Sequence, residues 1–148
     1  MPKVLKTALT VVVAILSHSA IEGADLSPKL WAGLSVYPQG PVIRGGEVER
    51  LQITFGVVND GTTPVNAQRM SGSSRLFING VELREWSLIV NNGGRGGQCF
   101  ALRPGQDCSF SYSLARYFRK PGIYVVRWEA PNFRASELTF RVVNEFRP

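Results

Sequence analysis

Large apolar side chains recur at every second position along most of the chain that follows Leu34. In residues 51–59, the alternate positions are large and apolar, and those between them are mostly polar or glycine. Similar alternation recurs in residues 108–114, 123–129 and 136–143. A period of two predicts β-strands with one buried face. No 3.6-residue stripe follows the N-terminal segment, so helices are not expected to form the scaffold.

Turn residues divide these strands. Residues 75–83 are the strongest hairpin prediction, because Asn79-Gly80 suits the positive φ angles of a two-residue type I′ turn. Further strands are expected at 34–37 and 86–90, and a single helical turn at 114–118. Seven or eight short strands predict an all-β, two-sheet antiparallel sandwich, because each one-sided sheet must cover its apolar face with another.

The N-terminal segment has the pattern of a secretory signal. Lys3 and Lys6 precede an apolar run at residues 8–16, which is about half the ~20 residues that a membrane-spanning helix needs. We therefore expect a cleaved signal peptide over residues 1–23 and one sandwich domain over residues 24–148. The protein would be secreted or periplasmic, with no membrane span in the mature chain.

Charge gives no sign of a nucleic-acid partner. The chain has 148 residues and a formal net charge of +6. Removing Lys3, Lys6 and Glu22 with the signal leaves 15 basic and 10 acidic residues, a net charge of +5. The basic residues are scattered rather than clustered, which is typical of a solvated surface.

Cys99 and Cys108 are expected to form a disulfide. They flank a turn signal at residues 103–106, and reflecting the chain through that turn places them opposite one another. An exported protein is where such a bond persists, and a ring of about ten residues gives about 2.5 kcal/mol by the loop-entropy model. The alternative is two free thiols, buried as small hydrophobic groups.

Three stretches near the C-terminus carry a resemblance to a known family. The Leu-Arg-Pro-Gly run at 102–105, the Pro-Gly-Ile-Tyr run at 121–124 and the closing strand at 138–143 resemble the last three strands of bacterial extracellular immunoglobulin-like domains. The resemblance covers roughly the last third of the chain and the 79–80 hairpin. It implies an immunoglobulin-like sandwich and says almost nothing about function.

Most familiar enzyme chemistry lacks its residues. The only histidine is His18, within the expected signal, so the mature chain has no imidazole for acid-base catalysis, a catalytic triad or a zinc site. The nearest carboxylate pairs are Glu47 with Glu49 and Glu82 with Glu85, and solvated charge is the simpler interpretation of both. We expect no enzyme, no cofactor and no metal.

The leading hypothesis is a secreted, non-catalytic immunoglobulin-like binding or accessory module that recognises a protein or a cell-surface glycan through its loops. The expected contact surface comprises residues 59–64, 91–97 and 131–135. Its candidate partner-binding residues are Asn59, Thr62, Thr63, Arg95, Phe133 and Arg134.

Two sheet-face arginines offer a rival site, although isolated solvated charges partly paired with Glu129 and Glu137 are the simpler interpretation. Strand alternation places Arg127 and Arg141 on an outer face, where they would make a cationic patch for an acidic partner. Among the tryptophans, Trp128 is expected in the core, Trp86 in the core or at its rim, and Trp31 is expected to be the least buried.

A secreted protease inhibitor is the alternative function. Loops 59–64 and 93–97, and Arg127-Trp128 with the loop through Arg134, resemble in order the three binding loops of chagasin-like inhibitors of papain-type proteases. Asp60-Gly61 replaces the proline of the first motif. The third loop lacks its aromatic residue unless Phe133 substitutes, because Arg127-Trp128 falls on a predicted strand.

Overall fold

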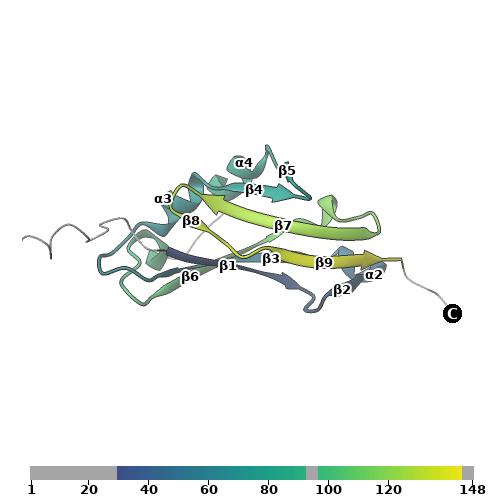
Figure 1. Cartoon of the computed structure of the whole chain (residues 1–148), viewed down its shortest axis with the longest axis horizontal. Helices are drawn as coiled ribbons and strands as arrows, with labels where there is room; N and C mark the ends of the chain where they lie inside the picture. The colour runs from purple at the N-terminus through teal and green to yellow at the C-terminus, as the bar shows by residue number, and fades with distance from the viewer. Residues whose placement is uncertain (1–29, 93–96, 145–148) are drawn as a thin grey trace, which may run out of the picture.

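The computed structural model describes residues 30–92 and 97–144, which form an all-β sandwich of two sheets (Figure 1). The smaller sheet has the order β1 (Leu30–Tyr37), β3 (Gln52–Asn59) and β6 (Asp107–Ser113). The larger sheet has the order β2 (Val42–Arg44), β9 (Leu138–Val143), β7 (Gly122–Ala130), β4 (Arg75–Ile78) and β5 (Val81–Glu82), and β8 (Phe133–Arg134) also pairs with β7. The described residues thus hold nine strands rather than seven or eight. The pairing of β2 with β9 is parallel, whereas the other strand pairs are antiparallel.

Short helices lie between the strands. They are α2 (Gly45–Val48), α3 (Ala67–Gly72), α4 (Trp86–Asn92) and the 3-10 turns η1 (Gly97–Phe100) and η2 (Ala115–Tyr117). The turn η2 confirms the single helical turn expected there. No helix in residues 30–92 or 97–144 combines the length and apolar character needed to cross a membrane.

The strand predicted at residues 86–90 is wrong, because these residues form α4. Trp86 and Val90 are both 1% exposed and lie four residues apart, on one face of the helix, whereas Leu88 is exposed. The run Trp-Ser-Leu-Ile-Val is too short for its periodicity to separate a helix from a strand. The segment forms a helix rather than a strand because the helix buries both Trp86 and Val90 against the sheets.

The predicted alternation is confirmed in β3, β6, β7 and β9. On β3, Ile53, Phe55 and Val57 are buried and the residues between them face outward. An aromatic cluster joins the two sheets: the Phe55 ring centroid lies 5.5 Å from that of Phe110 and 5.2 Å from that of Trp128 on β7. Trp86 from α4 also meets Phe55, at 4.7 Å between centroids. The core is therefore filled from both sheets and from one helix.

The Asn-Gly hairpin forms as predicted. Asn79 and Gly80 have φ angles of 50° and 78°, and Ile78 pairs with Val81 across a two-residue loop. The Asn79 side chain also accepts a hydrogen bond from the backbone N–H of Val125 at 2.8 Å. The turn is thereby attached to β7.

Candidate functional site

One end of the sandwich collects the loops of interest. Strands β3 and β7 end where β1 and β6 begin (Figure 1). The loop after β3 (residues 60–64), the loop before β6 (residues 103–106) and the β7–β8 turn (residues 131–132) therefore share this end. We call it the loop end, and α3 lies beside it (Figure 1).

Asn59, a candidate contact residue, holds the loop end together from inside. Its side chain is 0% exposed, and its amide donates to the carbonyl of Thr63 at 2.8 Å and to that of Leu102 at 2.9 Å. Its side-chain oxygen accepts from the N–H of Gly61 at 2.9 Å, closing an Asx turn. Asn59 is therefore a structural residue whose side chain does not reach a partner. The Asn-Asp-Gly sequence is the signal that foretells this turn.

The backbone of Asn59 extends the same network. Its N–H donates to the carbonyl of Gln106 at 3.0 Å, and its carbonyl accepts from the N–H of Gly105 at 2.8 Å. Val65 and Leu102 exchange two backbone hydrogen bonds, at 2.9 and 3.0 Å, beyond the turn. The loops on either side of Asn59 are thus fixed to one another.

The other candidate residues divide into two groups. Thr62 and Thr63 are exposed on the turn that Asn59 fixes, and Arg134 is exposed with its Nε 3.8 Å from a carboxylate oxygen of Glu129. Phe133 is only 6% exposed, because β8 pairs with β7 and turns its ring onto Trp128 at 4.5 Å between centroids. Phe133 therefore belongs to the core.

Two further expectations concern the remaining loops. Arg95 and most of the glycine-rich loop lie outside the described residues, as does the expected signal peptide. In the third loop, Trp128 is 0% exposed and Phe133 is buried, so residues 131–135 present no exposed aromatic side chain.

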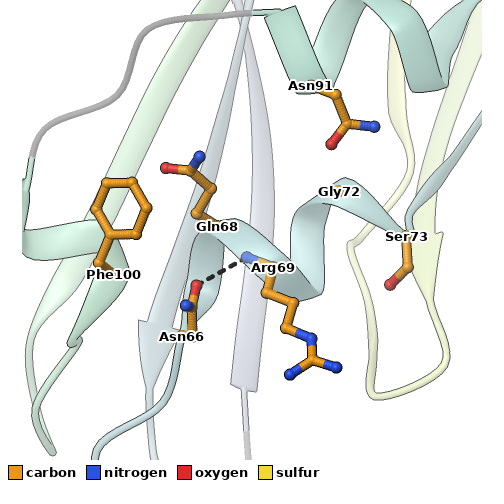
Figure 2. A pocket seen from close by; sticks show the side chains of 7 residues that line it. All are labelled: Asn66, Gln68, Arg69, Gly72, Ser73, Asn91 and Phe100. Atoms are coloured by element: carbon orange, nitrogen blue, oxygen red, sulfur yellow. Dashed lines mark hydrogen bonds between the residues drawn. The ribbon is translucent and has the colours of Figure 1, made fainter.

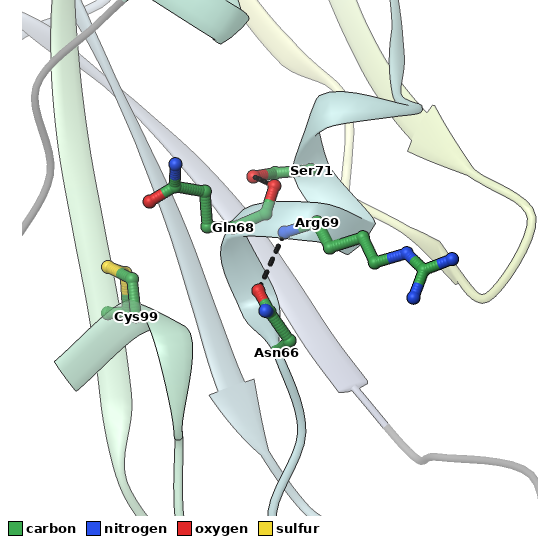
Figure 3. Close-up of a disulfide and its surroundings, with 6 residues drawn as sticks. Asn66, Gln68, Arg69, Ser71 and Cys99 are labelled. Atoms are coloured by element: carbon green, nitrogen blue, oxygen red, sulfur yellow. Dashed lines mark hydrogen bonds between the residues drawn. A yellow bond between two sulfur atoms is a disulfide. The ribbon is translucent and has the colours of Figure 1, made fainter. Parts of the chain in front are cut away.

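The Cys99–Cys108 disulfide is confirmed, but not for the geometric reason expected. The two Cα atoms lie 5.6 Å apart. Cys99 belongs to η1 rather than to a strand opposite Cys108, and Leu102 bridges to Val65 instead of folding back onto residue 105. The bond holds η1 against β6, and Cys99 lies near Gln68 of α3 (Figure 3).

Helix α3, η1 and the end of α4 enclose a shallow depression that the sequence analysis did not anticipate (Figure 2). Its volume is about 390 Å³. Phe100 approaches α3 from η1, and Asn91 approaches it from α4. The lining residues are Asn66, Gln68, Arg69, Gly72, Ser73, Asn91 and Phe100.

Local sequence explains the shape of this depression. Asn66 caps α3, because its side-chain oxygen accepts from the N–H of Arg69 at 2.8 Å. A side chain at Gly72 would place its Cβ 2.8 Å from the Asn91 side-chain oxygen, so glycine allows α4 to approach α3 closely. Phe100 leaves 51% of its surface exposed at the rim. The N-cap asparagine was the one available sign of α3, because the helix has no apolar stripe.

In each carboxylate pair considered above, Glu82 with Glu85 and Glu47 with Glu49, the two carboxylates bind separate partners. Glu82 pairs with Arg75 at 2.6 Å, whereas Glu85 pairs with Arg116 at 2.8 Å. The hydrogen bond from Arg75 lowers the pKa of Glu82, and burial together with the Glu85 hydrogen bond raises the pKa of Tyr117. Arg116 and Tyr117 follow the end of β6 that lies opposite the loop end, whereas Arg75 pairs with Glu129 of β7 beside it.

The Glu47 carboxylate accepts the N–H of Arg44 at 2.8 Å at the start of α2. Glu49 lies 3.8 Å from the Arg119 guanidinium. Residues 30–92 and 97–144 contain no group of three His, Cys, Asp or Glu side chains that could hold a metal ion.

At the rival site of Arg127 and Arg141, Arg127 already contacts neighbouring side chains. The Arg127 guanidinium lies 4.3 Å from the ring centroid of Phe77, and its Nε is 3.3 Å from the Glu129 carboxylate. Arg141 is exposed on β9. Arg127 is thus already engaged by Glu129 and Phe77, which weakens the expected cationic patch and favours the loop end as the candidate for a partner.

Comparison of the chain with protein-family models finds no match, and comparison with curated proteins finds none either. The class that the described geometry defines is an all-β two-sheet sandwich. Its candidate site is the loop end, where exposed Thr62 and Thr63 lie near the polar depression at α3.

Proposed function

We propose that this protein is a secreted, non-catalytic, immunoglobulin-like binding module that recognises a protein or a cell-surface glycan through the loop end. The observation that carries the proposal is the buried Asn59 network, which fixes a turn whose outward residues, Thr62 and Thr63, are exposed polar groups. The three hydrogen bonds of the buried Asn59 side chain hold the surface loop that follows β3 in one shape.

Preorganisation favours binding because a partner then loses less free energy to ordering the loop. Fixing one flexible residue costs about 1 to 2 kcal/mol, so a turn already held by hydrogen bonds avoids that cost. The Val65–Leu102 bridge connects this turn to α3 on one side and to η1 on the other. The same bridge therefore supports both the turn and two walls of the depression.

The depression adds chemistry suited to a polar ligand. Asn66, Gln68 and Asn91 bring amide groups, Arg69 brings a guanidinium, and Phe100 offers an exposed ring. A few polar groups beside an aromatic surface are typical of sites that bind peptides or sugars. Export to the cell exterior, which the N-terminal pattern predicts, would bring this surface to such partners.

A partner captured from the extracellular or envelope fraction of the source cells tests the proposal. We expect the Arg69→Ala, Phe100→Ala double variant to weaken binding of the purified partner by about tenfold or more. Leu88→Ala is the matched control, because Leu88 is 65% exposed on α4 and does not line the depression. Unchanged affinity in the double variant, with loss of binding on altering Arg127 and Arg141, would place the site on the sheet instead.

The inhibitor alternative gains no support from the third loop, because Trp128 and Phe133 are both buried. We therefore expect the purified protein to leave papain activity unchanged at micromolar concentration. Measured inhibition would favour the alternative over a general binding module.

A further inference from the structure

The smaller sheet has an outer face of unusual composition. The outward residues of β1 are Trp31, Gly33, Ser35 and Tyr37. The register aligns Gly33 with Gly56 and Ser109, and it aligns Ser35 with Thr54 and Ser111. We call the outward residues of β1, β3 and β6 the Trp31 face; its middle is made of glycine and hydroxyl side chains between two aromatic rings.

The Trp31 ring lies along the sheet. It is 60% exposed, yet a Cβ at Gly33 would come within 3.0 Å of its Cη2 atom and 3.2 Å of its Cζ3 atom. The indole thus covers Gly33 with one surface and presents the other to solvent. Glycine at position 33 is what allows the ring to lie down on the strand.

Tyr37 stands at the other end of the same strand and is 56% exposed. It is six residues from Trp31 on the same face, so the two Cα atoms are about 20 Å apart along the β-strand. Between them, the hydroxyl groups of Thr54 and Ser111 lie 2.7 Å apart in a hydrogen bond. The face therefore offers aromatic surfaces at both ends and hydrogen-bonding groups between them.

Charge is nearly absent from the Trp31 face. The chain has 17 Lys and Arg residues, but no outward position of β1, β3 or β6 is one of them. Asp107, at the Trp31 end, is the single charged residue on the face. A face without basic side chains on a strongly basic protein matches a neutral ligand, because an anionic ligand would find no counterpart there and a cation would find only Asp107 at one end.

We infer that the Trp31 face binds a neutral glycan chain that lies along β1. Aromatic rings stack on the C–H surfaces of sugar rings, and hydroxyl side chains exchange hydrogen bonds with sugar hydroxyls. A protein partner fits less well, since stable protein interfaces bury about 800 Å² per partner around an apolar centre, and the centre of this face is glycine and hydroxyl groups. This inference concerns a different surface and does not rest on the loop-end proposal.

Tryptophan fluorescence tests the inference directly. The chain has three tryptophans, and Trp86 and Trp128 are 1% and 0% exposed, so quenching by neutral acrylamide mainly reports Trp31. The probes are cellohexaose, chitohexaose, laminarihexaose and maltohexaose. We expect at least one of them to reduce quenching in a saturable titration. If none protects Trp31 at millimolar concentration, the inference is wrong.

Variants then locate the bound sugar by calorimetry. Trp31→Ala and Tyr37→Ala should each weaken binding of the active hexasaccharide by about tenfold. Gly33→Val should also weaken it, because the new side chain displaces the indole while a β-branched residue suits the strand. Leu88→Ala on α4 is the control and should bind as the original protein does.

Salt and the loop-end variants separate the two proposed surfaces. Affinity at the Trp31 face should change less than about twofold when salt is raised, because the expected ligand carries no charge. Affinity that survives Trp31→Ala but falls in the Arg69→Ala, Phe100→Ala variant would place the sugar at the loop end and overturn the inference. Thermal unfolding of each variant verifies that the fold is retained.

Discussion

Ser74 joins the two tryptophans of the core through a single hydroxyl group. The indole N–H groups of Trp86 and Trp128 both donate to its Oγ, at 2.9 and 2.8 Å, and the hydroxyl itself donates to the carbonyl of Ser71. Ser74 is 6% exposed. One small residue thus satisfies two buried donors that come from different elements.

Removing that hydroxyl should be costly. Ser74→Ala leaves two buried N–H groups without an acceptor, and we expect the free energy of unfolding to fall by about 3 kcal/mol. Ser73→Ala is a matched control, because the Ser73 hydroxyl is exposed and donates to the nearby carbonyl of Met70. Urea unfolding of both variants measures the difference. Equal, small effects would show that water replaces the Ser74 hydroxyl at no cost.

At the scale of elements, the long strands and the helical turn η2 were predictable, whereas α2, α3, α4 and the short strands β2 and β8 were not. Alternation locates β3, β6, β7 and β9 because each has one face in the core and one in solvent. Trp86–Asn92 carried an apolar run without a clear period, and Ala67–Gly72 carried none. Burial of Trp86 and Val90 against the sheets selects a helix for α4. The N-cap at Asn66 marks the start of α3.

The candidate site was predictable in the same partial way. Thr62 and Thr63 are exposed as expected, because a polar turn after a strand lies at the surface. Phe133 is buried by the two-residue strand β8, which is too short to have a period. The depression at α3 joins three elements distant in sequence, so no local pattern reveals it.

The disulfide fixes η1, one wall of the depression, and its removal should loosen that wall. Cys99 and Cys108 are separated by nine positions, and closing such a ring contributes about 2.5 kcal/mol in the loop-entropy model. We expect the Cys99→Ala, Cys108→Ala variant to lose about that much stability in urea unfolding. Faster amide exchange at Phe100 should accompany the loss. A variant as stable as the oxidised protein would show that β6 and α3 hold η1 without the bond.

The β4–β5 hairpin contains an acid-sensitive ion pair. The hydrogen bond from Arg75 lowers the pKa of Glu82, so the folded state favours the ionised carboxylate. The resulting stability is present above the unfolded-state pKa and is lost as the pH falls through the lowered folded-state value. The melting temperature of the original protein should therefore slightly exceed that of Glu82→Gln at neutral pH. The two should converge in strong acid, and a gap that persists there would contradict this origin.

At the scale of the whole molecule, the two outer faces of the sandwich differ in chemistry. The larger sheet carries ion pairs such as Arg75 with Glu82 and Arg127 with Glu129, whereas the smaller sheet carries glycine, hydroxyl and aromatic residues. The loop end lies between them and holds the exposed Thr62, Thr63 and Arg134. One fold thus presents three distinct surfaces to possible partners.

These surfaces can bind extracellular partners only if the protein is exported. The expected signal peptide ends between Ser19 and Ala24, so N-terminal sequencing of the exported protein should begin within residues 20–24. Exported protein that begins at Met1 would remove this premise.

Mapping a bound partner onto the backbone tests the central claim most directly. Nitrogen-15-labelled protein, titrated with the captured partner, should show its largest amide shifts at Thr62, Thr63, Arg69 and Phe100. Amides of β7 and β9 around Arg127 and Arg141 should stay nearly unchanged. The opposite pattern, with shifts concentrated at Arg127 and Arg141 and none at the loop end, would contradict the account.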